Sequence, residues 1–176
     1  HLLNFTSGIT LAVLPDFSLN KVGEFITMVF YLANLSIGVL LGNFIKLFQS
    51  FSSRKITYFH VLFSLLYFIF TIYSNITFSI LFFTLIWVLI GISNVLLLSI
   101  VQKIINVEKI RNVYIVINSL SITVMPVDSL FVAIISKYIN SQFIMLICAI
   151  LVLLVSIIWI SIKELRILPK TDKITL

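Results

Sequence analysis

The chain has 176 residues, of which 61% are apolar and only 10% are charged, against about 25% charged residues in soluble domains. A soluble domain of this length could not bury so much apolar surface, so the composition excludes that class and predicts an all-α, polytopic transmembrane helical bundle. The net charge of +6 does not indicate nucleic-acid binding, because the cations form short clusters between apolar runs.

Residues 1–19 are apolar but interrupted, and we expect a partial helix followed by an external loop. Pro15 and Asp16 predict a turn, because the residue before a proline avoids the helical region and aspartate favours loops. The chain begins with His1 and shows no cationic segment followed by a cleavage site, so a signal peptide is not indicated. We expect a fragment or a trimmed product of a longer protein.

Residues 20–162 are predicted to form a domain of five membrane spans, the first of them over residues 25–45. Those 21 uncharged residues would rise about 31 Å as a helix, which is enough to cross a bilayer core of about 30 Å. Gly38 and Gly42 stand four residues apart, a spacing that lets two helix backbones approach closely. We interpret the pair as a packing contact within the bundle, with dimerisation as the alternative.

The longest uncharged stretch covers residues 56–102 and is interrupted near its middle by Ser74 and Asn75. Its 47 residues fit two spans joined by a tight turn, since one crossing needs roughly 20 apolar residues. His60 lies within about one helical turn of the cytoplasmic boundary. We interpret it as an interfacial side chain, with a proton relay as the alternative.

The rest of the chain alternates between polar and apolar segments. Pro126 lies inside the fourth span and predicts a kink, because proline lacks the N–H that continues the helical hydrogen bonds. The predicted segments are a cytoplasmic loop over residues 102–112, a span over 113–136, an external loop over 137–142, a last span over 143–162 and a basic cytoplasmic tail over 163–176.

Lysine and arginine beside spans mark the cytoplasmic side of a membrane protein, and they orient this chain. The predicted external loops hold two cations, Lys21 and Lys137. The predicted cytoplasmic segments hold Lys46, Arg54, Lys55, Lys103, Lys109, Arg111, Lys163, Arg166, Lys170 and Lys173. This split predicts an integral plasma-membrane protein with a cytoplasmic C-terminus. The richness in Ile, Phe, Asn, Ser and Lys is typical of an AT-rich genome and indicates a bacterial source.

Two groups of residues resemble signatures of the major facilitator superfamily. The segment from Gly38 to Asn43, followed by Arg54 and Lys55, is similar to the loop signature after the second helix of each half. In that signature a glycine and an acid or amide precede a basic pair. Asn43 stands here at the acid position, and residues 47–53 replace the intermediate Arg-Gly.

The second group resembles the macrolide-efflux branch of that superfamily. In that branch a Gly-x-x-Asn helix, a glutamine near its end, a Gly-Arg-Val loop and an Asn-Ser-Leu helix with a proline follow in order. Arg111 and Asn112 replace the Gly-Arg pair here, and Asp128 replaces the small residue expected after the proline. The matching residues are Gly91, Asn94, Gln102, Val113, Asn118, Ser119, Leu120 and Pro126.

The resemblance covers nearly the whole chain and implies helices seven to twelve of a twelve-helix transporter. The implied partners are the lipid bilayer, a missing N-terminal six-helix half and a small amphipathic or drug-like substrate, with no cofactor. Such a transporter rocks its halves around a site near the bilayer midplane, so proton-coupled efflux by alternating access is expected. Asn43, Arg54 and Lys55 are expected at the cytoplasmic gate, and Gly91 at a packing contact.

Asp128 is the acid that lies well inside a predicted span, about 12 Å from its external end. A carboxylate at that depth faces protein or water, pairs with a cation, or takes up a proton. It is a candidate proton-coupling residue, and a water-accessible vestibule acid or a drifted position are the alternatives that stay open beside it. Asn94, Asn118 and Ser121 are candidates to line the cavity, although interhelical hydrogen bonding is an equally good interpretation.

No enzyme site is indicated by the sequence. Two histidines, one cysteine and six scattered acids give no metal-binding spacing, no nucleophile beside a base and no phosphate loop. The main alternative to a transporter is a non-transporting accessory or immunity-type membrane protein, or the inert fragment of a disrupted transporter. A membrane subunit of an ATP-driven exporter would need a soluble nucleotide-binding partner.

Overall fold

The computed structural model describes residues 2–22, 25–44, 53–73, 75–105 and 107–162. Over these ranges the chain forms helices and turns without a strand, which confirms the all-α class. The helices are α1 (Leu2–Val22), α2 (Phe25–Phe44), α3 (Ser53–Ile72), α4 (Ile76–Ile104), α5 (Val107–Ile135) and α6 (Ser141–Ser161).

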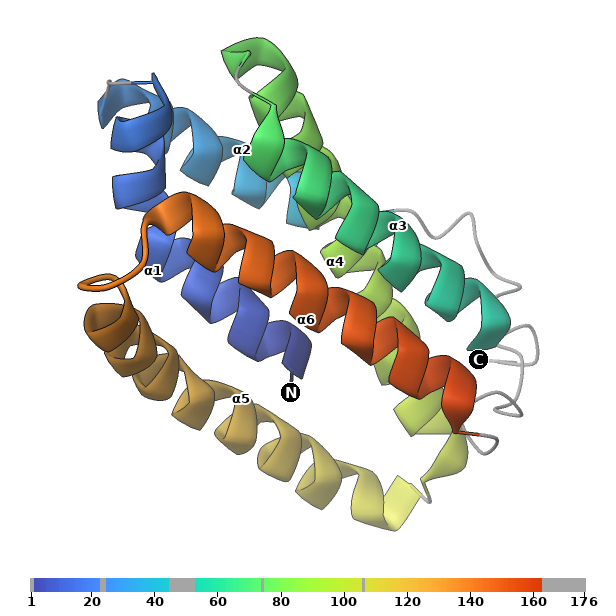
Figure 1. Ribbon diagram of the computed structural model, residues 1–176. Helices are drawn as coiled ribbons and strands as arrows, with labels where there is room; N and C mark the ends of the chain where they lie inside the picture. Colours follow the sequence, from blue (N-terminus) through green and yellow to red (C-terminus); the bar gives the residue numbers. More distant parts are fainter. Residues whose placement is uncertain (1, 23–24, 45–52, 74, 106, 163–176) are drawn as a thin grey trace.

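The helices run back and forth between two ends of one bundle. Figure 1 shows the end of α1, the α3–α4 turn and the end of α5 toward one side of the molecule. The beginning of α3, the α4–α5 corner and the end of α6 lie toward the opposite side. The bundle therefore has two ends, and successive helices cross from one to the other.

Two asparagines begin the helices that follow tight turns. The side-chain oxygen of Asn75 accepts a hydrogen bond from the backbone N–H of Thr77 at 3.0 Å, and that of Asn140 accepts one from Phe143 at 3.0 Å. Both side chains satisfy amide groups that have no partner within the first turn of a helix. The predicted break between two helices is confirmed, because α3 ends at Ile72 and α4 begins at Ile76 with Asn75 as its cap, while Ser74 lies outside the described residues.

The helix contacts show an internal repeat. If α1, α2 and α3 are matched to α4, α5 and α6 in that order, each principal contact of one set has a counterpart. The extensive α2–α4 contact corresponds to α1–α5, the α3–α4 contact to α1–α6, and α1–α2 to α4–α5, while α3–α6 corresponds to itself. Each set of three crosses the bundle an odd number of times. The two sets therefore run in opposite directions and pair in the corresponding way, although the α2–α4 contact is more extensive than α1–α5.

The turn predicted at Pro15 and Asp16 is wrong, because α1 continues through both residues to Val22. Buried side chains on both sides of the proline, Val13 and Phe17, hold this segment against the bundle. Asp16 lies on the exposed face and accepts a hydrogen bond from the Asn20 amide at 2.9 Å, one turn further on. Packing of the apolar face thus outweighs the local preference of proline and aspartate for a turn.

The cytoplasmic loop predicted over residues 102–112 is also wrong. The helix α4 continues to Ile104, and α5 begins at Val107 with Glu108 in its first turn, where a carboxylate favours a helix N-terminus. The Gln102 amide donates a hydrogen bond to the Tyr114 hydroxyl at 2.9 Å, which ties the end of α4 to α5. The polar residues of this region therefore belong to helices that meet at a sharp corner.

Two helices in the described ranges are long and apolar enough to cross a membrane, over Ile76–Gln102 and Ser141–Ser161. Three further apolar helical stretches are shorter: Thr27–Gly42, Tyr58–Ile72 and Pro126–Ile135. The helix α5 continues through Pro126, whose side chain is exposed. The structure thus shows membrane-spanning capacity in α4 and α6.

Three glycines bring α2 and α4 into close contact. A β-carbon built on Gly42 would lie 2.9 Å from the Cα of Gly91 and would overlap the backbone carbonyl oxygen of Val88. One built on Gly38 would lie 2.8 Å from the carbonyl oxygen of Thr84. The two backbones therefore touch over two turns, and any side chain at these glycines would hold them apart.

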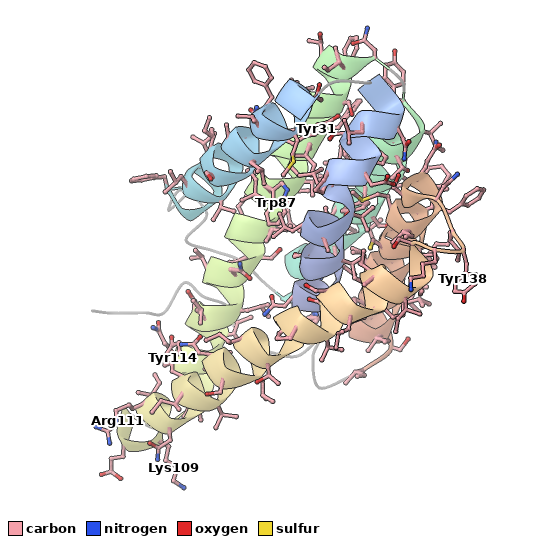
Figure 2. The ribbon with its side chains drawn as sticks, turned by 90° about the vertical axis from the view of Figure 1, so that its left-hand side faces the viewer. Tyr31, Trp87, Lys109, Arg111, Tyr114 and Tyr138 are labelled. Atoms are coloured by element: carbon pink, nitrogen blue, oxygen red, sulfur yellow. The ribbon has the colours of Figure 1, made fainter. Side chains whose placement is uncertain are left out.

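Aromatic rings fill the space between α1, α2, α3 and α4. The ring centroids of Phe17 and Phe70 lie 5.1 Å apart, those of Phe70 and Phe83 5.3 Å, and those of Tyr31 and Phe83 5.0 Å. Tyr31 also forms a 2.8 Å hydrogen bond with the Ser79 hydroxyl, which satisfies its polar end inside this core. Figure 2 shows Tyr31 and Trp87 between the helices, on the inside of the bundle.

Candidate functional site

The carboxyl group of Asp128 on α5 lies directly against Gly8 of α1. A β-carbon built on Gly8 would lie 2.6 Å from the carboxyl carbon of Asp128 and would overlap one of its oxygens. The Asp128 side chain is only 1% exposed. Both of its oxygens are buried and lack a hydrogen-bond partner in the part of the chain that the structure describes. The contact thus buries an acidic group for which the described residues supply no hydrogen-bond donor.

Apolar contacts next to Asp128 hold α5 against α1. The rings of Phe5 and Phe131 lie 5.7 Å apart, and Val132, one turn beyond Asp128, is buried. Most of the other described side chains of α5 are exposed or half-buried. The acid therefore lies within the main contact of α5 with the bundle, the one with α1.

A hydroxyl and thiol cluster lies between α1, α3 and α6. The hydroxyls of Thr10 and Tyr67 share a hydrogen bond, and the Tyr67 hydroxyl donates to the sulfur of Met145 at 3.5 Å. The buried Cys148 thiol lies next to both hydroxyls and within electrostatic range of the Asp128 carboxyl. The cluster therefore connects the Asp128 region with the interior of the bundle.

His60 of α3 is buried, so the prediction of an interfacial side chain is wrong. Its side chain is 1% exposed, and its ring stands edge-on to that of Trp159 on α6, with centroids 5.9 Å apart. Neither ring nitrogen has a hydrogen-bond partner among the described residues. Distance from the helix end places His60 about two turns after the start of α3, but the helix is rotated so that this face packs against α6.

The structure keeps the predicted cavity residues apart from Asp128. Asn94 on α4 and Asn118 on α5 are both exposed, whereas Asp128 faces α1. The side chains of Asn43, Arg54, Lys55 and Ser121 lie outside the described set, although their backbones belong to α2, α3 and α5. The sequence did not reveal the Thr10, Tyr67 and Cys148 cluster. A usable signal was the one-turn spacing of Thr6 and Thr10 on α1.

Gly8→Ala is expected to destabilise the protein by about 1–3 kcal/mol, because the new methyl group overlaps the Asp128 carboxyl and overpacks the α1–α5 contact. Adding Asp128→Ala removes the overlapping atoms, so the double variant should regain stability relative to Gly8→Ala alone. Unfolding of the detergent-solubilised protein by SDS, followed by circular dichroism, measures both effects. The exposed Ala12→Val on the same helix is the control, and equal losses with and without Asp128→Ala would contradict the contact.

Within the described residues, no group of three His, Cys, Asp or Glu side chains could hold a metal ion. Comparisons of the chain with models of protein families, with curated proteins and with solved structures found no match.

Proposed function

We propose that this chain is the C-terminal half of a transporter of the major facilitator type, which exports a small amphipathic or drug-like molecule by alternating access. Proton binding at Asp128 drives the export. The observation that carries the proposal is the Asp128 carboxyl group, buried in the contact between α5 and α1 with no hydrogen-bond partner in the described part of the chain. A carboxyl group in such a place is costly to keep ionised, which makes it suited to taking up and releasing a proton.

The exchange of helix contacts between α1–α3 and α4–α6 supports this architecture. Each six-helix half of a major facilitator transporter contains two sets of three helices in inverted orientation. In this chain the two sets have opposite directions and corresponding helix pairings, as that arrangement requires. We assign α2 to α6 as the five membrane spans, and α1 as the helix that completes the set.

The surface of the bundle supports insertion into a membrane. Large apolar side chains are half or more exposed on helices all around the bundle, among them Val29, Leu40, Leu65, Leu81, Ile122, Leu130, Phe143 and Ile150. Figure 2 shows Lys109 and Arg111 at the outer tip of α5, whereas Tyr138 lies at its other end. In the proposed topology the first of these ends is cytoplasmic, and the acyl chains of the bilayer cover the apolar surface.

The Asp128 contact provides an element with two states. A neutral Asp128 allows α5 to close on Gly8, whereas an ionised carboxylate favours a state in which the group reaches water or a cation. An aspartate at the centre of a span costs about 2.5–3.5 kcal/mol on insertion scales, and one elementary charge gains about 2.3 kcal/mol per 100 mV of membrane potential. The two energies are similar, so a proton gradient can shift this equilibrium.

A transporter also needs polar side chains that line its substrate cavity. We assign this role to the exposed amide side chains of the chain. Asn94 and Asn118 stand exposed on α4 and α5, among apolar residues such as Val95 and Leu120. Amides facing lipid are unfavourable, so we assign these faces to a cavity closed by the N-terminal half that a transporter of this type contains. Together with Ser121 they would offer hydrogen bonds in an apolar wall, which suits an amphipathic substrate. Asn43, Arg54 and Lys55 belong to the cytoplasmic gate.

Accumulation of a fluorescently labelled macrolide in cells that express the intact reading frame tests this function. We expect lower accumulation than in empty-vector cells, and we expect a protonophore to abolish the difference. Immunoblotting of the membrane fraction verifies that the protein is present. If accumulation equals that of empty-vector cells although the protein is in the membrane, a non-transporting accessory protein or an inert fragment becomes the better description.

A further inference from the structure

One face of α3 is polar although it is buried against α6. His60, Ser64, Tyr67 and Thr71 follow one another at intervals of three or four residues, and all four side chains are buried. This spacing places them in a row along one side of the helix. A helix that packs inside an apolar bundle normally presents apolar side chains at such positions, so the row needs an explanation.

Each residue of this row contacts α6. The Ser64 hydroxyl donates to the backbone carbonyl oxygen of Ala149 at 3.1 Å, and the Tyr67 hydroxyl donates to the Met145 sulfur. The His60 ring stands against the Trp159 ring. The backbone carbonyl oxygen of Thr71 accepts a hydrogen bond from Gln142 at 3.2 Å. The polar row therefore runs along the α3–α6 contact for most of its length.

His60 and Asp128 stand at the two ends of the polar region, and both are buried ionisable groups without a hydrogen-bond partner among the residues that the structure describes. His60 lies seven residues after the start of α3 at Ser53, and Asp128 lies seven residues before the end of α5 at Ile135, about 10 Å from each helix end. Those helix ends lie on opposite sides of the bundle (Figure 1). The groups thus stand near opposite membrane surfaces in the proposed topology.

The region between them contains groups that both donate and accept hydrogen bonds. From Asp128 the order is the Cys148 thiol, the hydrogen-bonded hydroxyls of Thr10 and Tyr67, and then the Ser64 hydroxyl. Hydroxyl and thiol groups can accept one proton while they release another. The route also requires bridging water between groups that are not in direct contact, such as Ser64 and His60.

We propose that this row carries the proton through the bundle and that His60 is a second proton-binding residue. This inference rests on the proposed function. A proton bound to the Asp128 carboxylate passes along the thiol, the hydroxyls and bridging water to a ring nitrogen of neutral His60, which releases it at the cytoplasmic end. Each step breaks one bond to hydrogen and forms another, and no group is oxidised or reduced.

The ionisable residues of α3, α4 and α6 are compatible with a neutral imidazole at His60 that gains a proton only transiently. The helix α6 carries Cys148 as its ionisable group, and α4 carries Lys103 near its cytoplasmic end. On α3 itself Arg54 and Lys55 lie in the first turn. No carboxylate on these helices is available to hold His60 permanently in its charged form.

Transport in proteoliposomes by the protein that the intact reading frame encodes tests the inference. Vesicles of phosphatidylethanolamine and phosphatidylglycerol contain the pH dye pyranine, and labelled macrolide is the substrate. Proton-driven uphill transport with its proton flux is compared with counterflow, in which labelled and unlabelled macrolide exchange without net proton movement. In His60→Gln and Tyr67→Phe we expect uphill transport and proton flux to fall about a hundredfold, with counterflow unchanged. Tyr58→Phe, which alters an exposed tyrosine on α3, is the control.

The possible results separate the inference from the proposed function. Wild-type uphill transport in both variants would overturn the proton route and leave Asp128 as the coupling residue. Equal losses of uphill transport and counterflow would show that His60 and Tyr67 only maintain the structure, which also overturns the route. If the wild-type protein moves neither macrolide nor protons, the proposed function fails and the inference fails with it.

Discussion

Asp128→Asn is expected to abolish proton-driven export while the protein remains folded in the membrane. The amide has almost the same shape as the carboxyl group, so it fits against Gly8, but it cannot take up or release a proton. The α1–α5 contact would then stay in the state that a protonated Asp128 favours. Macrolide accumulation in Asp128→Asn cells should equal that of wild-type cells treated with a protonophore.

Counterflow distinguishes this loss of coupling from a loss of structure. Exchange of labelled for unlabelled macrolide does not require net proton movement, so Asp128→Asn should retain it. The matched control is Asp16→Asn, which changes an exposed carboxyl on α1 that already accepts a hydrogen bond from Asn20. We expect this control to export like the wild type. Undiminished uphill export by Asp128→Asn would show that the coupling proton binds elsewhere.

Asp128→Glu extends this prediction to geometry. The additional methylene group would push the carboxyl toward the backbone of α1, which already lies against Asp128 at Gly8. We therefore expect Asp128→Glu to fail in uphill export although it retains an ionisable group. Export at the wild-type rate would mean that the contact opens in the resting protein.

The helices could be predicted from the sequence wherever an uncharged run is long and flanked by charge. This local signal is present for α2, α3, α4 and α6, whose observed ranges lie close to the predicted spans. The signal failed where polar residues occur inside a helix. Pro15 and Asp16 are held in α1 by packing on both sides, and the polar residues after Gln102 continue in helices at the α4–α5 corner.

The candidate site could be predicted only in part, because its contacts join distant segments. Asp128 stands out as an acid inside a span, but the residue it contacts is Gly8, which is recognisable only by the absence of a side chain. The hydrogen bond between Thr10 and Tyr67 links two ordinary polar residues 57 positions apart. For His60, the distance to the helix end was informative, whereas the side of the helix on which it lies required the packing of α6.

Gly42→Ala is expected to reduce stability more than a typical change at a helix surface. The new methyl group would overlap the carbonyl oxygen of Val88 and would lie 2.9 Å from both the Cα of Gly91 and the amide nitrogen of Ile92. These are backbone atoms, which cannot move aside by a side-chain rotation, so α2 and α4 must separate. We expect a loss at or above the upper end of the usual 1–3 kcal/mol for overpacking.

Unfolding in SDS, followed by circular dichroism, measures this loss, with Ala33→Val as the matched control. Ala33 is exposed on the same helix, so its enlargement should change stability by no more than about 0.5 kcal/mol. Gly91→Ala should resemble Gly42→Ala, and the double variant should lose less than the sum, because one methyl group already separates the helices. A Gly42→Ala protein as stable as Ala33→Val would show that this contact is looser than the structure indicates.

The glycine contact also explains why the two equivalent helix pairs would behave differently during transport. The α2–α4 contact corresponds to α1–α5, but backbone touches backbone in the first and an ionisable carboxyl fills the second. Closing the first pair depends on shape alone, whereas closing the second depends on whether Asp128 carries a proton. We therefore expect Gly42→Ala to lower uphill export and counterflow together, in contrast to Asp128→Asn, which should lower only uphill export. If Gly42→Ala lowered uphill export alone, the α2–α4 contact would not be permanent, and its contrast with the proton-dependent α1–α5 contact would be wrong.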